Sequence, residues 1–310
     1  MTNTSATALL SLVPERAFST DSAVDILQFA AECLDGGSGV ALATLIEIRG
    51  GSARALGAHM AVREDGRYCG VVSGGCIEAA VASEAVDAIG EGADRHVLFG
   101  EGSPFFDIVL PCGGGITIAI HVLRHSAPIR TVLDKLQGRI PAGLRYEPSA
   151  QALTAIEAPK RAGWQSGSFV TVYRPKARVF LSGRSIEVDT TARIAEAAGY
   201  DVYRHDNANL EPYASLIDAD TAVALLHHDI DLEIPVLQAA LGAEPFYLGA
   251  LGSARTHARR MERLRDIGYS ESDIARIKSP IGIFNRARDA QSLALSVLAD
   301  LAAMRVARFG

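Results

Sequence analysis

The sequence predicts an α/β protein with two domains: an N-terminal α+β domain with a mixed sheet and a C-terminal domain with a parallel sheet. The chain has 310 residues, 48% of them hydrophobic, which is enough to form more than one buried core. Near Pro175 the pattern changes from hairpins and short elements to strands that alternate with helices. We therefore expect a flexible N-terminus over residues 1–21, a first domain over residues 22–175 and a second domain over residues 176–310.

The first domain is expected to consist mainly of strands. Asp21 is suited to cap a helix that runs to about residue 33. Asp65-Gly66 joins two strands in a hairpin, and an Ala-rich helix follows over about residues 77–89. Over residues 128–175 the pattern weakens into short elements. The predicted strands of this domain span residues 40–48, 58–63, 68–73 and 115–123.

The second domain is expected to alternate strands with helices. Such alternation is typical of a parallel sheet that helices cover on both faces. A long helix over residues 290–308 closes the chain and offers an apolar face for a homodimer. The predicted strands span residues 178–182, 201–205, 221–227 and 245–250, and the helices between them span residues 186–198, 230–241 and 254–266.

Two cysteines stand beside paired glycines, in Gly74-Gly75-Cys76 and in Cys112-Gly113-Gly114. Glycine lets the backbone turn sharply and lets a ligand approach it, which favours a reactive or ligating sulfur over an inert one. Cys76 also precedes a predicted helix, whose free amides and dipole stabilise a thiolate or an anion. Glu78, just inside that helix, is expected to complement the dipole. We expect the two loops to form one site.

The alternative for each cysteine is structural. Cys112 would then pack inside a strained turn, and Cys76 would begin a helix without binding anything. Cys33, on a helix, and Cys69, inside a strand, are most simply small buried hydrophobic residues.

Composition excludes several classes of function. With 30 basic and 36 acidic residues, the chain has a net charge of −6. It therefore lacks the net positive charge that would attract nucleic acid non-specifically. No apolar run reaches the roughly 20 residues of a membrane-spanning helix. The cysteines form no CxxC pair and no secretory leader stands at the N-terminus, so we expect reduced thiols in the cytoplasm.

The second domain begins with the layout of a dinucleotide-binding, Rossmann-like unit. A strand, Gly183, a helix and a second strand are followed by Asp206, at the place where a carboxylate binds a ribose hydroxyl. Only the first glycine of GxGxxG is kept: Ser185 narrows the approach of a pyrophosphate and Glu187 adds a negative charge. NAD(P) or nucleotide binding and a retained fold with an altered or absent ligand both remain open.

Two further turns of this domain are candidate sites. Gly252, Ser253 and Arg255 follow a strand and enter a helix, so they are suited to hold a phosphate; the alternative is a glycine turn with a solvated arginine. His227-His228-Asp229 is either a metal site or a pair of polar loop residues.

The chain resembles the xanthine dehydrogenase accessory protein (XdhC/CoxI) family over about residues 22–305. Its N-terminal half matches in Arg49-Gly50-Gly51-Ser52-Ala53-Arg54, in Ser73-Gly74-Gly75-Cys76-Ile77-Glu78 and in Pro111-Cys112-Gly113-Gly114. Its C-terminal half matches in Gly249-Ala250-Leu251-Gly252-Ser253-Ala254-Arg255 and in Ser279-Pro280-Ile281-Gly282. It departs at Gly183-Arg184-Ser185, where the family commonly has a GAGH-type glycine pair, and at Ile283-Phe284-Asn285, where it commonly has Asp-Ile-Gly.

The resemblance implies a chaperone that binds the molybdenum cofactor in its molybdopterin form. Such a protein assists sulfuration of the cofactor and its insertion into an apo molybdenum hydroxylase, a xanthine dehydrogenase-like partner, with a cysteine desulfurase or sulfurase as a further partner. Cys76 and Cys112 are then candidate molybdenum contacts, because molybdenum accepts soft sulfur ligands, and Arg54 is a candidate for the cofactor's phosphate. The glycines that would shape the cradle are Gly74, Gly75, Gly113 and Gly114.

Two other functions remain open. One is a nucleotide- or NAD(P)-dependent oxidoreductase that uses the Rossmann-like domain, although no intact phosphate loop and no acid–base pair stands out in the sequence. The other is a scaffold that bridges a sulfurase and its target enzyme.

Overall fold

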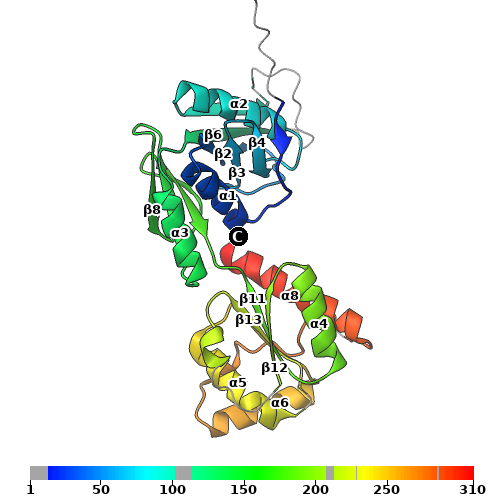
Figure 1. Cartoon of the computed structure of the whole chain (residues 1–310). Helices are drawn as coiled ribbons and strands as arrows, with labels where there is room; N and C mark the ends of the chain where they lie inside the picture. Colours follow the sequence, from blue (N-terminus) through cyan, green and yellow to red (C-terminus); the bar gives the residue numbers. More distant parts are fainter. Residues whose placement is uncertain (1–12, 102, 104–113, 207–212, 228, 285) are drawn as a thin grey trace, which may run out of the picture. The chain divides into compact units, whose positions relative to one another are not determined.

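The computed structural model describes residues 13–101, 103, 114–206, 213–227, 229–284 and 286–310 (Figure 1). The chain divides into two compact units, Met1–Tyr173 and Arg174–Gly310. The division falls close to the expected boundary at residue 175. Each unit has its own sheets and its own buried clusters.

The N-terminal unit is built on a six-stranded mixed sheet, sheet A, in the order β1-β4-β3-β2-β6-β5. The β1–β4 pair is parallel and the other pairs are antiparallel, which confirms the predicted mixed sheet. Because β1 pairs with β4, residues 15–16 of the expected flexible N-terminus belong to the sheet. The strands are β1 Glu15–Arg16, β2 Val40–Arg49, β3 His59–Arg63, β4 Arg67–Gly70, β5 Arg95–Gly100 and β6 Gly115–Val122.

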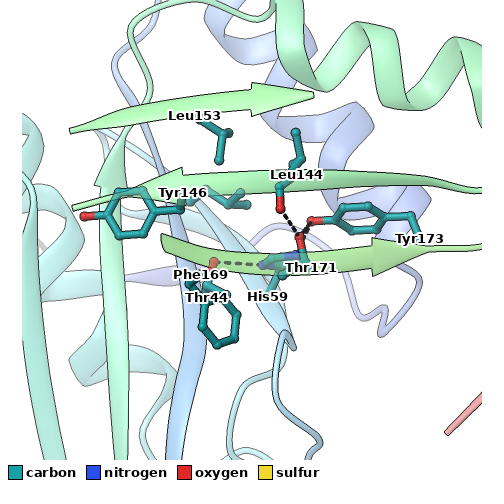
Figure 2. Close-up of a pocket in the computed structure, with 9 residues that line it drawn as sticks. Thr44, His59, Leu144, Tyr146, Leu153, Phe169, Thr171 and Tyr173 are labelled. Carbon is teal, nitrogen blue, oxygen red and sulfur yellow. Dashed lines mark hydrogen bonds between the residues drawn. The ribbon is translucent and has the colours of Figure 1, made fainter. Parts of the chain in front are cut away.

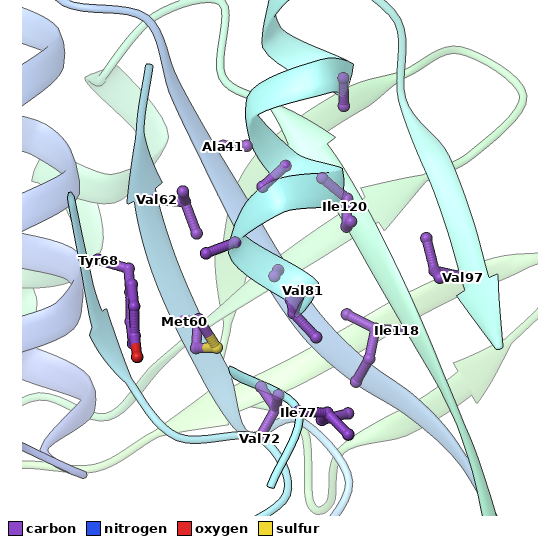
Figure 3. Packing of buried hydrophobic residues seen from close by; sticks show 14 of the residues in the cluster. Ala41, Met60, Val62, Tyr68, Val72, Ile77, Val81, Val97, Ile118 and Ile120 are labelled. Carbon is purple, nitrogen blue, oxygen red and sulfur yellow. The ribbon is translucent and has the colours of Figure 1, made fainter. Parts of the chain in front are cut away.

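Sheet A is covered on both faces because its strands alternate between two apolar sets. On one face, helix α2 (Glu78–Glu91) packs over Ala41, Met60 and Ile118 (Figure 3). On the other face, α1 (Ala23–Asp35) and α3 (Ala127–Gln137) share a second buried cluster with Leu42 and Ala61.

Helix α1 begins one residue later than the sequence predicts. Ser22 is its N-cap, and the side chain of Ser22 accepts a hydrogen bond from the amide of Asp25 at 3.3 Å. The prediction of Asp21 as the cap is therefore wrong. Asp21 instead pairs with Arg54.

Residues 128–175 were expected to hold only short elements, but they begin with most of α3 and then form a regular four-stranded antiparallel sheet, sheet B, in the order β8-β7-β10-β9. Its contacts with sheet A include two hydrogen-bonded groups. The Asp94 carboxylate accepts hydrogen bonds from His121 at 2.7 Å and from the Tyr146 hydroxyl at 3.1 Å, and the Trp164 indole N–H donates to the Ile46 carbonyl at 3.2 Å. The strands are β7 Ala142–Glu147, β8 Ala152–Glu157, β9 Gly163–Gln165 and β10 Ser168–Tyr173.

The C-terminal unit is a parallel four-stranded sheet, sheet C, in the order β12-β11-β13-β14, as predicted. Helices α4 and α8 share one buried cluster with the sheet, and α5 and α6 share another. The strands are β11 Arg178–Ser182, β12 Asp201–His205, β13 Thr221–Leu225 and β14 Tyr247–Ala250. The helices are α4 Ile186–Ala197, 3-10 helix η1 Tyr213–Leu216, α5 Ile230–Ala243, α6 Ala254–Asp266, α7 Glu271–Ile274 and α8 Ala290–Phe309.

Within the described ranges, α8 is the one helix that is long and apolar enough to cross a membrane by length and composition. Its residues Ala294, Val297 and Leu301 are buried in the cluster that covers sheet C. It packs as a core helix of this unit.

Candidate functional site

The topology of sheet A brings the glycine-rich loops to one end of the sheet. Strands β2 and β4 end there, at Arg49 and Gly70, and β6 begins there at Gly115. The ladder fixes this placement, because Arg49 pairs with Gly115 and Met60 pairs with Gly70. We call residues 50–58, between β2 and β3, the glycine loop, and residues 71–77, between β4 and α2, the cysteine loop.

The glycine loop lies against Gly114 on one side and against Gly74 of the cysteine loop on the other. A Cβ built on Gly114 would stand 2.3 Å from the Arg49 carbonyl oxygen and 3.0 Å from the Gly51 carbonyl oxygen. A Cβ on Gly74 would stand 3.3 Å from the Cβ of Ala53. The site-forming segments that the sequence predicted, around Gly74 and Gly114, therefore both lie against one intervening loop.

Cys76 is exposed, and its thiol is free. The two residues before it, Gly74 and Gly75, have φ angles of +116° and +111°, which only glycine adopts without strain. Nothing lies within 4 Å of a Cβ built on Gly75. The loop thus presents its sulfur at an open tip. Cys112 and Gly113 lie outside the described residues, so the pairing of Cys112 with Cys76 stays a prediction.

Glu78 plays a larger part than the sequence suggests. Its side chain is buried, and its carboxylate accepts hydrogen bonds from the Ser73 amide at 2.9 Å and from the Ser73 hydroxyl at 2.9 Å. It also accepts hydrogen bonds from three more amides of the cysteine loop, those of Val72, Gly74 and Ile77.

The protein therefore supplies its own negative charge at the start of α2. Burial alone would raise the pKa of Glu78, but the hydrogen bonds from Ser73 and Gly74 outweigh it, so the pKa lies below its ordinary value. From the sequence, the amides at the start of this helix are expected to be free for a thiolate or an anion, but the amide of Ile77, its N-cap, is already bonded to Glu78.

Two arginines bring positive charge to the same end of the sheet. Arg54 forms an ion pair with Asp21 at 3.0 Å, in which both side chains are partly exposed. Arg49 is exposed, and its Nη2 lies 2.6 Å from the position a Cβ of Gly115 would take. In the part of the chain that the structure describes, Arg49 has no carboxylate partner. Sequence reasoning missed Arg49; its place just before a Gly-Gly turn was the available signal.

A separate cavity lies between sheets A and B (Figure 2). Its volume is about 10 Å³, room for about one water molecule, so it is too small for a cofactor. Along its wall, Thr44 Oγ1 lies 3.0 Å from His59 Nδ1, and His59 Nε2 is hydrogen-bonded to the Tyr173 hydroxyl. Burial lowers the pKa of His59 to about 4, so the imidazole is neutral at pH 7.

In the C-terminal unit, Gly183 is a packing residue and does not line an open phosphate loop. A Cβ on Gly183 would stand 2.9 Å from Val188 Cγ2 and 3.0 Å from the Leu226 carbonyl oxygen. Arg184 is hydrogen-bonded through Nε to the carbonyl of the exposed Asp206. The first turn of α4 carries two carboxylates, Glu187 and Asp189. A pyrophosphate would meet negative charge at this helix.

The turn before α6 is likewise used internally. Gly252 has a φ of +133°, and a Cβ there would stand 2.9 Å from Thr256. The Ser253 hydroxyl caps α6 by accepting a hydrogen bond from the Thr256 amide at 3.3 Å. Arg255 is exposed. Of the three residues proposed for a phosphate here, the structure leaves Arg255 at the surface and gives Ser253 a capping role.

Sequence reasoning also missed a buried polar cluster at the carboxyl edge of sheet C. Ser182 Oγ lies 3.2 Å from His205 Nδ1 and 2.8 Å from His227 Nε2. Only the strand register places Ser182 beside His205, so no local motif signals the contact. Among the described residues, no group of three or more His, Cys, Asp or Glu side chains is arranged for a metal ion. His228, the middle residue of the segment His227-His228-Asp229 for which a metal site was one alternative, lies outside those residues.

Comparison with known families matches both units of the chain. Residues 33–100 match the model of the XdhC and CoxI family, and residues 179–301 match the model of the XdhC Rossmann domain.

Individual proteins are similar over nearly the whole chain. The molybdenum cofactor insertion chaperone PaoD of Escherichia coli is 54% identical over 94% of this chain and 92% of its own. A protein of Bacillus subtilis named as a probable xanthine dehydrogenase component is 24% identical over 84% of this chain and 91% of its own. A crystal structure of a protein from Bacillus halodurans, described as a xanthine dehydrogenase, shares the fold, with a TM-score of 0.69 at 21% identity over 93% of this chain and 96% of its own.

Proposed function

The chain belongs to the XdhC and CoxI family, and we propose that it binds the molybdenum cofactor as cargo and delivers it to an apo-enzyme. The relative that is 54% identical is named as a molybdenum cofactor insertion chaperone. Because that likeness extends over nearly all of both chains, the same role is the function best supported for this chain.

One observation on the molecule carries the proposal: Cys76 is exposed directly after Gly74 and Gly75, and Gly74 lies against the glycine loop that also contacts Gly114. Molybdenum accepts soft sulfur ligands, so a free thiol at an open tip suits a cargo that must be held and then released. Cys112, which precedes Gly114 by two positions in the sequence, is proposed as the second sulfur.

The phosphate of the cofactor needs positive charge, which Arg49 and Arg54 supply. Arg49 has no carboxylate partner among the described residues, and the Arg54–Asp21 pair is partly exposed, so exchanging Asp21 for a phosphate costs little. Glu78 places a negative charge at the start of α2, so the proposed position of the phosphate is on the side of the glycine loop.

The proposal also covers the partners, the oligomeric state and the location of the protein. We propose a xanthine dehydrogenase-like molybdenum hydroxylase as the client, assistance with sulfuration of the cofactor by a cysteine desulfurase or sulfurase, action as a homodimer and a cytoplasmic location. A cargo carrier of this kind binds and releases its ligand and needs no turnover.

The test is to purify the full chain after co-expression with cofactor synthesis and to measure bound molybdenum and pterin. We expect near-stoichiometric cofactor in the wild type and at least about a tenfold loss in Cys112→Ala and in Cys76→Ala. Cys33→Ala, which removes a partly buried thiol on α1, serves as the matched control and should keep its cargo. Absence of cofactor from the wild type would contradict the function, and equal content in all variants would contradict the sulfur assignment.

A further inference from the structure

A single buried carboxylate holds the cysteine loop in place. Oε1 of Glu78 accepts hydrogen bonds from the amides of Val72 at 3.0 Å, Ser73 at 2.9 Å and Gly74 at 3.2 Å. Oε2 accepts hydrogen bonds from the Ile77 amide at 3.2 Å and from the Ser73 hydroxyl at 2.9 Å. Both carboxylate oxygens therefore accept hydrogen bonds from the loop, and the exposed fraction of Glu78 is 1%.

The two ends of the loop are anchored by buried side chains. Val72 and Ile77 are buried in the cluster under α2, where Figure 3 shows them near the start of that helix. Between them Gly74 and Gly75 adopt positive φ angles, and Cys76 is exposed. Glycine has more backbone freedom than any other residue, so the path of this stretch depends on the hydrogen bonds that close it.

We propose that Glu78 is the positioning residue of the sulfur site: its carboxylate closes the loop and thereby fixes where the Cys76 thiol points. The part of this proposal that concerns cofactor affinity rests on the proposed function. The part that concerns the thiol itself is independent of any cofactor. Among the described residues, the hydrogen bonds of the Glu78 carboxylate all come from loop amides and the Ser73 hydroxyl, so we assign it a role that acts through Cys76 and not that of a ligand.

The variant Glu78→Gln removes the negative charge of the side chain and keeps its length. Glutamine has the same length, but one of its two terminal atoms is an NH₂ donor, which cannot accept the hydrogen bonds of one carboxylate oxygen. The matched control is Glu84→Gln on the same helix, where the carboxylate bonds Arg95 at 2.8 Å and does not contact the loop. Ser73→Ala is a milder second variant, because it removes one hydroxyl donor and keeps the carboxylate.

The first measurement follows alkylation of Cys76 by iodoacetamide in the full chain, quantified on the Cys76 peptide by mass spectrometry across pH 6 to 9. We expect Glu78→Gln to change the rate at least about threefold and to change its pH profile, Ser73→Ala to shift it in the same direction by less, and Glu84→Gln to match the wild type. A wild-type rate and profile in folded Glu78→Gln would overturn the proposal. Should Glu78→Gln fail to fold, Ser73→Ala provides the test: a wild-type alkylation rate and pH profile in Ser73→Ala would then overturn the proposal.

The second measurement is a double-mutant cycle on bound cofactor. Glu78→Gln alone should lower cofactor content at least about fivefold, and it should have no further effect when Cys76→Ala is already present. If the fold losses of bound cofactor in the two single variants multiply in the double variant, Glu78 acts independently of the Cys76 thiol, which contradicts the proposal. Absence of cofactor from every protein, together with the expected alkylation result, would reject the proposed function and keep the role of Glu78.

Discussion

Gly114 lies so close to Arg49 that a Cβ on Gly114 would stand 2.3 Å from the Arg49 carbonyl oxygen. The contact is between main chains, so neither partner can move aside as a flexible side chain would. The first residue after the undescribed stretch 104–113 is therefore fixed against the end of β2.

We expect Gly114→Ala to lower the free energy of unfolding of the N-terminal unit by about 2–3 kcal/mol, because the added methyl group overpacks a backbone contact. Gly90→Ala is the matched control: it lies in α2, and nothing stands within 4 Å of the added carbon. Alanine favours a helix over glycine, so this control should be neutral or stabilising by up to about 1 kcal/mol. Urea unfolding curves check both, and equal stability of the two variants would contradict the expected clash.

Arg49→Gln is expected to weaken cofactor retention by about tenfold, since it removes a cation that has no carboxylate partner among the described residues and leaves the fold intact. Arg67→Gln is the control, because Arg67 begins β4 at the end of the strand opposite the cysteine loop. Bound pterin and molybdenum after purification provide the measurement. Retention that is as low in the control as in Arg49→Gln would mean that the effect is one of overall charge.

His59 makes the stability of the N-terminal unit depend on pH. Its pKa is about 4 in the folded chain, below the value of 6.5 for an unperturbed histidine, so the unfolded chain binds the extra proton. The stability contributed by neutral His59 is complete above pH 6.5 and is lost as the pH falls toward 4, by about 2–3 kcal/mol.

The variant His59→Gln should remove that part of the pH dependence, and exposed His125→Gln should keep it. Urea midpoints at pH 7.5, 6, 5 and 4.5 provide the comparison. If wild type and His59→Gln lose stability in parallel between pH 7.5 and 4.5, the buried neutral histidine is not the cause.

A buried ion pair lies in the C-terminal unit. Arg260 is fully buried, and its Nε donates to Glu233 at 2.7 Å, while its Nη2 donates to the Leu251 carbonyl at 2.8 Å. Glu233→Gln leaves the guanidinium charge uncompensated, so we expect a loss of about 3–5 kcal/mol in the free energy of unfolding.

The exposed pair Arg265–Glu271 offers the control, and Glu271→Gln should have little effect. Hydrogen exchange of the β13 amides reports the unfolding of this unit. Equal exchange rates in the two variants would argue against the ion pair.

The architecture of the C-terminal unit could be predicted well from the sequence. Its strands are short apolar runs and its helices are amphipathic, so periodicity alone located β11, β12 and α4 to within a few residues. Sheet B was missed because β8 and β9 are only partly buried and therefore lack a clear apolar pattern. Strand β5 was missed as well.

The candidate site could be predicted only where function lies in local motifs. The motif around Cys76 was visible in the sequence; Gly74 and Gly114 each lie against the glycine loop, and the pairing of Cys76 with Cys112 stays a prediction. The binding of loop amides by Glu78 and the contact of Ser182 with His227 depend on distances that folding creates, so no spacing rule reveals them. Likewise, the crowding at Gly183 comes in part from Leu226, more than forty residues later in the chain.

Trp164 is the only tryptophan of the chain, and its indole N–H bonds the Ile46 carbonyl across the boundary between sheets A and B. Intrinsic fluorescence of the native protein is therefore a built-in optical probe of that junction. An emission shift records the parting of the two sheets, whereas a transition confined to Arg174–Gly310 occurs without an indole of its own to report it.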